Sequence, residues 1–455
     1  MKGWILALTL CAAASAQVKL PPYSREVLPN GTVVYLMEKP GLPLVSFHVL
    51  VKGGNESEPE GMAGLAQLTA GLLRRGSAQL TPDQFNDELD GLGGTFGAFV
   101  NEQATAISAE FLKKDFDRGL ALVAGAVLHP SFPEDEVRKA LARSADGLKS
   151  IKDNPGASIG QYYDRFFYGA AHPYGRVADE ASIDRIRRQD IIGYHDRLYV
   201  GKNLIVVVAG DFDSAVAKKR VAETFGAAPG GEAYRWAEDH PPVASGGNRV
   251  LLVDKSDATQ TYFVIAQPGV RRTTPDRVPL TLVNTLFGGR FTSMINEELR
   301  INTGLTYGAN ARVEMNRLTG AIYISSYTKT ETTARAVDLA LEVLKRLHDK
   351  GITAEQLASA KAYVKGTYAP NRLQTSDQIA NVLAEMELYG LGRDEVDQYF
   401  QRIDAVTLEQ ANAVIKKYYG TENLTFVLLG NAAKIRDAAA KYGKVEEKTV
   451  RQTGW

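Results

Sequence analysis

Leu204-Ile-Val-Val-Val-Ala-Gly-Asp211 and Leu424-Thr-Phe-Val-Leu-Leu-Gly-Asn431 are two apolar stretches of equal length, each closed by a glycine and a polar residue. Short apolar runs bounded in this way are typical of buried strands. Each stretch follows the end of a helical segment and a turn, within 194–211 and 414–431. This recurrence predicts that the chain contains two copies of one design.

The segments before these stretches also correspond. Long helical patterns cover about 129–151 in the first copy and 349–367 in the second, where Thr353 and Gln356 have the spacing of a capping box. In the early part of the chain, Asn30-Gly31 between alternating apolar residues predicts a hairpin over 26–38. Further strands are predicted at 44–51, 95–100, 104–111, 250–253, 262–266, 305–313 and 320–326, and further helices at 61–75, 82–92, 279–286 and 292–300.

The fold class that follows is α+β, with two homologous sandwich-like halves in a clam-shell arrangement. In each half we expect an antiparallel sheet covered by helices. Prolines and glycines are dense between residues 226 and 248, as expected of an exposed linker. The predicted divisions are a signal peptide at 1–16, a first domain at 17–225, the linker at 226–248, a second domain at 249–441 and a C-terminal tail at 442–455.

The first residues predict export. Lys2 precedes an apolar run, and Ala14-Ser15-Ala16 supplies small residues for cleavage before Gln17. An uncleaved anchor is the alternative. Cys11, the only cysteine, would leave with the signal, so the mature chain would have no disulfide and no thiolate. We expect a periplasmic or extracellular protein without an integral membrane segment. The 53 basic and 53 acidic residues balance, which gives no indication of a nucleic-acid partner.

Several motifs, in order, resemble the pitrilysin/insulinase family of metallopeptidases, the inverzincins. They are 28–35 (LPNGTVVY), 64–77 (GLAQLTAGLLRRGS), 93–98 (GGTFGA), 172–175 (HPYG) and 203–211 (NLIVVVAGD). The resemblance covers nearly all of the mature chain. It implies a peptide-processing role and a zinc-binding helix at 64–77.

Active members of that family carry His-x-x-Glu-His on this helix, where two imidazoles bind zinc and the glutamate activates a water molecule. In this chain Gln67 and Gly71 fall at the histidine positions, and Ala70 falls at the position of the base. An amide is a poor zinc ligand, and glycine and alanine have no donor atom. The sequence therefore predicts that this chain holds no metal.

The remaining candidates for ligands do not replace the motif. The family implies a third ligand about 75 residues further on, and Asp146 is the only carboxylate within 144–149, where we expect a solvated helix residue. The six histidines (His48, His129, His172, His195, His240 and His348) include no pair at helical ligand spacing. A site assembled from distant histidines is a less favoured alternative.

An arginine and a tyrosine from the second half also contact substrate in the family, and here Arg300 and Tyr307 match that pattern. The resemblance implies that Arg300 ends a helix, that Tyr307 lies on the following strand, and that both act in catalysis. A guanidinium can fix a peptide carbonyl, and a phenol can donate to a developing oxyanion. The alternative is that Arg300 merely ends a helix and Tyr307 is an ordinary strand residue.

Substrate is expected to add as a strand to an edge beginning at Gly93. The predicted substrate-binding residues are Gly94, Thr95, Phe96, Gly97 and Ala98, and an internal strand is the alternative. The first helix is rich in small residues (Ala63, Gly64, Ala66, Ala70 and Gly71), which we interpret as close packing where a metal cavity would otherwise lie.

Some members of the family divide catalysis between two chains, one with the zinc motif and one with the Arg/Tyr pair. This sequence has only the second signature. It therefore resembles the non-catalytic subunit of a hetero-oligomer, inactive alone, whose zinc-bearing partner cleaves peptides. The alternatives are a non-enzymatic peptide-binding or structural subunit, and a self-sufficient enzyme with an unrecognised site.

Overall fold

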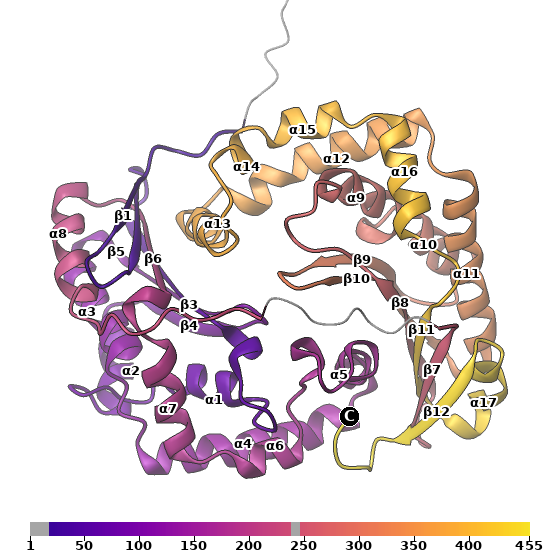
Figure 1. The fold of residues 1–455 in the computed structure, drawn as a ribbon, viewed down its shortest axis with the longest axis horizontal. Helices are drawn as coiled ribbons and strands as arrows, with labels where there is room; N and C mark the ends of the chain where they lie inside the picture. The colour runs from indigo at the N-terminus through magenta and orange to yellow at the C-terminus, as the bar shows by residue number, and fades with distance from the viewer. Residues whose placement is uncertain (1–17, 238–245) are drawn as a thin grey trace, which may run out of the picture.

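The computed structural model describes residues 18–237 and 246–455, so the predicted signal peptide with Cys11, and His240 in the linker, lie outside the described residues. The described chain forms two halves, each built on one six-stranded sheet (Figure 1). The predicted α+β fold with two related halves is confirmed.

The two sheets have equivalent strand orders, β1-β2-β6-β3-β5-β4 and β12-β7-β11-β8-β10-β9. In the first, the strands are β1 (Ser24–Val27), β2 (Val33–Glu38), β3 (Leu44–Lys52), β4 (Thr95–Val100), β5 (Ala104–Leu112) and β6 (Leu204–Gly210). In the second, they are β7 (Arg249–Asp254), β8 (Gln260–Pro268), β9 (Ala309–Met315), β10 (Gly320–Lys329), β11 (Thr425–Gly430) and β12 (Lys444–Thr449).

The sheets are mixed rather than antiparallel, which corrects the prediction. The central strand β6 pairs parallel with β2 and antiparallel with β3, and β11 pairs in the same way with β7 and β8. Every residue of β6 and of β11 is buried, as their continuous apolar sequences predict. The hairpin around Asn30-Gly31 is confirmed, because β1 pairs antiparallel with β2.

Helices cover the faces of both sheets. In the first half they are α1 (Leu65–Leu72), α2 (Pro82–Gly91), α3 (Phe116–Leu128), α4 (Glu134–Asp153), α5 (Pro155–Tyr168), α6 (Glu180–Arg185), α7 (Arg188–Leu198) and α8 (Ser214–Phe225). In the second half they are α9 (Arg277–Asn284), α10 (Met294–Asn296), α11 (Thr333–Lys350), α12 (Ala354–Arg372), α13 (Ser376–Leu388), α14 (Asp394–Asp397), α15 (Tyr399–Ala405), α16 (Leu408–Tyr418) and α17 (Ala432–Ala440). The predicted capping box at Thr353 and Gln356 is present at the start of α12.

Each half supplies one helix to the sheet of the other half. Helix α13 packs on β3 and β6 of the first sheet, and α5 packs on β8 and β11 of the second (Figure 1). Two polar contacts help to hold α13 in place: His48 Nε2 lies 2.8 Å from Asp377 Oδ1, and the Tyr35 hydroxyl donates to Glu387 at 2.6 Å. The two halves therefore share their cores instead of folding as separate units.

The described part of the predicted linker, residues 226–237, is mostly exposed or half-buried and runs along the first half. Gly201 N donates to Pro229 O at 2.7 Å, and Tyr234 N donates to Asn203 Oδ1 at 2.7 Å. Residues 442–455, expected to be a tail, contain β12, and the buried Trp455 packs against Tyr162 of α5. Among the helices of the described chain, none has both the length and the apolar character needed to cross a membrane.

Candidate functional site

Helix α1 presents the positions at which zinc ligands would stand. Gln67 and Gly71 lie four residues apart on one face of the helix and are exposed, whereas Ala70 is buried. Ala63 and Ala66 are also buried, but a Cβ placed on Gly71 would meet no atom within 4 Å. The prediction that small residues close this site by packing is therefore wrong at Gly71. The face is open and has no imidazole, thiolate or carboxylate.

The N-terminus of α1 is fixed by a buried glutamate that sequence analysis did not single out. Glu58 Oε1 accepts hydrogen bonds from Gly64 N at 3.0 Å and Ala66 N at 2.8 Å. Gly64 has φ of 98°, a left-handed conformation that favours glycine. Burial raises the pKa of Glu58 to about 8, although the two N–H donors act in the opposite direction. Six residues separate Glu58 from Gly64, so no local capping pattern reveals this contact.

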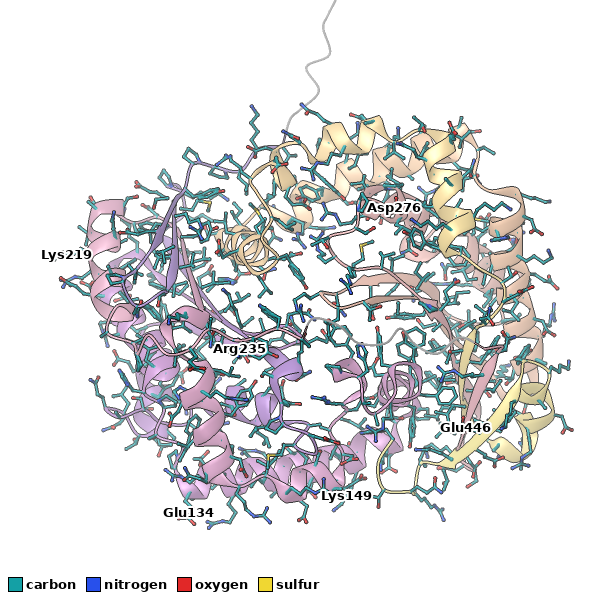
Figure 2. All side chains as sticks on the ribbon, in the orientation of Figure 1. Glu134, Lys149, Lys219, Arg235, Asp276 and Glu446 are labelled. Carbon is teal, nitrogen blue, oxygen red and sulfur yellow. The ribbon has the colours of Figure 1, made fainter. Side chains whose placement is uncertain are left out.

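The region of the expected third ligand gives no replacement. Asp146 lies on α4 with a side chain that is 78% exposed, and its partner is Lys149, at 3.5 Å. Figure 2 shows Lys149 at the periphery of the molecule. Within residues 18–237 and 246–455 no group of three His, Cys, Asp or Glu side chains is arranged to hold a metal ion. Asp146 is a solvated helix residue, as predicted.

Four of the histidines in the described chain have local partners. His195 Nε2 lies 2.9 Å from Val127 O, and His348 Nδ1 lies 2.8 Å from Tyr419 O. His172 Nδ1 accepts from Tyr174 N at 3.0 Å, and His48 faces Asp377 as described above. His129 is on the surface. These contacts join neighbouring elements and give no indication of a shared ligand.

Strand β4, which begins at Thr95, is the edge strand of the first sheet, as predicted. It pairs only with β5, and α1 packs beside it. Phe96 and Val100 point into the core, whereas Thr95, Gly97 and Phe99 are exposed and Ala98 is half-buried. The preceding Gly94 has no room for a side chain, because a Cβ there would lie 2.4 Å from the Phe111 ring. The structure therefore brings an unpaired backbone edge next to the open face of α1.

Arg300 and Tyr307 lie in the second half, in the segment between α10 and β9. Arg300 is within the π-helical turn Glu297–Asn302, near the helix end where we expected it. Tyr307 was expected on a strand, but it lies in the loop that precedes β9, and it is 79% exposed. The strand starts later because Gly304, with φ of 63°, turns the chain and the next residues bond back to the helix.

The backbone between these two residues is held by many contacts. Leu305 N donates to Leu299 O at 2.9 Å, and the Thr328 hydroxyl donates to Leu305 O at 2.7 Å. The Ser326 hydroxyl donates to Gly308 O at 2.9 Å. Ala309 N donates to the buried side chain of Asn296 at 3.2 Å. The loop is thus positioned from both sides of Tyr307, on α10 and on β10.

The two side chains themselves are not engaged by hydrogen bonds. In the described part of the chain, neither the Arg300 guanidinium nor the Tyr307 hydroxyl has a hydrogen bond or ion pair, and the guanidinium stacks on Phe291 at 4.8 Å. Phe291 is itself 60% exposed. Both groups are available to donate to a ligand. Figure 1 shows α10 and β9 across the molecule from α1, so the structure does not join this pair to the α1–β4 region.

Comparisons with known proteins agree with this architecture. The model of the insulinase family (peptidase family M16) matches residues 33–159, and the model of the peptidase M16 inactive domain matches residues 185–364. The first match lies within the first half, and the second runs from the end of the first half into the second half. The chain belongs to peptidase family M16.

Relatives of similar length carry two kinds of name. An uncharacterized zinc protease of Mycobacterium leprae is 27% identical over 407 residues, which cover 87% of this chain and 90% of that protein. A non-peptidase homolog of Helicobacter pylori is 23% identical over 397 residues, which cover 86% of this chain and 90% of that protein.

Two solved structures share the fold. A peptidase M16 inactive domain from Pseudomonas fluorescens superimposes with a TM-score of 0.83 at 24% identity, over 90% of this chain and 98% of that one. A protease from Helicobacter pylori superimposes with a TM-score of 0.80 at 21% identity, over 90% of this chain and 100% of that one. At these identities the likeness establishes the fold alone.

Proposed function

We propose that this chain is an exported, zinc-free subunit of a two-chain or larger peptidase of family M16. In this proposal a partner subunit holds the zinc ion and activates the water molecule. This chain supplies Arg300 and Tyr307, which contact the peptide carbonyl and the developing oxyanion, and it helps to bind the peptide along β4.

The observation that carries the proposal is the state of Arg300 and Tyr307. Their backbone is fixed by hydrogen bonds to α10 and β10, while their polar groups have no partner within the described chain. A tyrosine that served only packing would be buried, and Tyr307 is 79% exposed. Donors that are positioned in advance and free of competing bonds are what transition-state stabilisation requires.

The face of α1 supports the division of labour. Gln67 and Gly71 expose an amide and a bare Cα where two imidazoles would be needed, and Ala70 offers a methyl group in place of the base. Metal chemistry at this position would therefore have to come from another chain. The zinc protease name of one relative and the non-peptidase name of another suit a family in which some chains have lost the metal site.

Reconstitution tests this proposal. The purified chain, beginning at Gln17, is mixed with a zinc-bearing family member from the same cell, and hydrolysis of a fluorogenic peptide is followed. We expect activity to rise on mixing and to fall when Arg300→Ala replaces the wild-type chain. Arg335→Ala, an exposed arginine on α11, is the control and should behave as wild type. Equal activity with Arg300→Ala in a properly formed complex would refute the proposed role.

A second candidate function is peptide binding without a part in catalysis. The observation in its favour is β4, an edge strand with unpaired backbone groups beside the open face of α1. This candidate predicts a stable complex that binds peptide equally well with and without Arg300 and Tyr307. Substitution of Gly97 by proline would remove a backbone donor from β4 and weaken binding, while both side chains of the second half would be dispensable.

A further inference from the structure

A cavity of about 410 Å³ lies in the second half, where α9, α12, α13 and the end of β9 meet α14 and α15. Its volume is in the range of sites for small molecules. Neither Arg300, Tyr307 nor any residue of α1 or β4 lines it. The cavity is therefore separate from the regions to which the proposed function refers.

The wall of the cavity contains more cations than anions. Three arginines line it (Arg272, Arg277 and Arg372), together with two glutamates (Glu385 and Glu395). Glu385 accepts from Arg272 at 2.9 Å and also from Arg372. Glu395 accepts from Arg277 and from Arg402, at 3.0 Å. Arg402 also donates to Asp394 at 2.8 Å. The three arginines of the wall therefore face two glutamates, and one positive charge has no anion of its own.

The carboxylate between Arg272 and Arg372 is ionised. Burial alone would raise the pKa of Glu385, but the guanidiniums of Arg372 and Arg272 outweigh it and hold this pKa below its usual value. Glu385 therefore contributes a negative charge to the wall of the cavity.

Arg372 is the residue with unused donors. Its Nη2 bonds to Glu385, whereas its Nη1 has no hydrogen bond within the described chain. The Arg372 side chain is 39% exposed, so this terminal nitrogen is open to a ligand. The rest of the wall is mainly apolar or aromatic and includes Val313, Met386 and the rings of Tyr368 and Tyr399, whose centroids lie 4.4 Å apart at a tilted angle.

We propose that this cavity binds a small organic carboxylate with an apolar tail, its carboxylate group at Arg372. One uncompensated positive charge matches a monoanion better than a dianion such as phosphate. The Nη1 group of Arg372 can donate a charge-assisted hydrogen bond to a carboxylate oxygen. Val313, Met315 and Met386 would enclose the apolar tail, and the volume limits the ligand to a size near that of one or two amino-acid residues.

Titration calorimetry with the full chain tests the proposal. The probe is N-acetyl-leucine, with N-acetyl-leucinamide as the neutral analogue of equal shape. We expect the acid to bind and the amide to bind at least ten-fold more weakly, because the amide cannot pair with the free charge. A longer peptide that ends in the same leucine distinguishes two sources: tighter binding assigns a peptide C-terminus, and weaker binding assigns a free small acid.

Two variants keep the test decisive. Arg372→Gln should lower affinity for the acid at least ten-fold. Arg346→Gln, which breaks the pair between Arg346 of α11 and Glu298 outside the cavity, should leave it unchanged. Val313→Phe fills the cavity without touching the arginines and should also abolish binding, so it serves if Arg372→Gln folds poorly. Equal binding of acid and amide, or no binding by the wild-type chain at millimolar concentration, would overturn the proposal.

Discussion

Replacement of Tyr307 by phenylalanine separates a catalytic role from a structural one, because the two roles predict different magnitudes. The Tyr307 side chain is 79% exposed, and its hydroxyl has no hydrogen bond in the described chain. Loss of that hydroxyl should therefore change the free energy of unfolding by less than about 0.5 kcal/mol, as for other surface substitutions. If the hydroxyl donates to the oxyanion in the complex, its loss should lower turnover by about 10²–10³, or roughly 2.7–4 kcal/mol of barrier.

The assay measures both quantities on the same preparation. Urea denaturation gives the free energy of unfolding of the variant, and single-turnover peptide hydrolysis in the presence of a zinc-bearing partner gives the rate. We expect the Tyr307→Phe complex to bind peptide normally and to turn it over slowly. The loss should appear in kcat and not in KM, because the hydroxyl acts in the transition state.

Tyr363→Phe is the matched control. Tyr363, on α12, is also a partly exposed tyrosine of the second half, and Arg290 lies 5.8 Å from the centre of its ring. The control should leave both stability and turnover unchanged. A Tyr307→Phe complex that turns over like the control, or one in which stability falls along with activity, would refute the reasoning.

Three further predictions concern two glycines, the buried Glu58 and the open face of α1. Gly288→Ala should destabilise the fold by about 1–3 kcal/mol, because a Cβ there would lie 2.1 Å from Ala311 N. Gly71→Ala should stabilise the fold by up to about 1 kcal/mol, because the site is open and alanine favours a helix. Urea denaturation measures both changes. Burial raises the pKa of Glu58 to about 8, so between about pH 4.5 and 8 the folded state retains a proton that the unfolded state has lost. The free energy of unfolding should therefore fall by roughly 3–5 kcal/mol as pH rises through that range. Glu58→Gln should remove this part of the pH dependence in urea denaturation measured across the same range. Gln67→His combined with Gly71→His places two imidazoles on the exposed face of α1, and the variant should bind zinc in competition with a chromogenic chelator. It should still not hydrolyse peptides, because Ala70 supplies no base. Zinc binding no stronger than that of the wild type would contradict the described geometry of the helix.

The local elements of the fold followed from sequence because their signals are local. Asn30-Gly31 specifies a turn, Thr353 and Gln356 specify a helix start, and the apolar runs at 204–210 and 425–430 specify buried strands. Each of these depends on residues within a few positions of one another. The repetition of the pattern was sufficient to predict two related halves.

The arrangement between distant segments could not be obtained in this way. An amphipathic helix such as α13 shows that one face is buried, but not which sheet covers it, and it packs on the sheet of the other half. Strand β12 was missed because its sequence, KVEEKT, lacks the apolar alternation of a half-buried strand. It completes the sheet by pairing in parallel with β7.

The sequence motifs single out residues for the candidate site, but they do not describe the environment of those residues. The helix with Gln67, the edge strand at Thr95 and the Arg300/Tyr307 pair were identified from their motifs. The open space at Gly71 and the loop position of Tyr307 depend on how neighbouring segments approach, for example on the bond from Thr328 to Leu305 O. Glu58 was missed because burial, and not its type or spacing, gives it an unusual pKa.

The most direct test of the central claim is the zinc content and peptidase activity of the isolated chain. The purified protein is dialysed against zinc, its bound metal is measured, and its hydrolysis of a peptide mixture is followed without any partner. We predict far less than one equivalent of tightly bound zinc and no hydrolysis, because α1 offers an amide and a glycine where two imidazoles would be needed. One full equivalent of bound zinc together with unaided peptide hydrolysis would contradict the account.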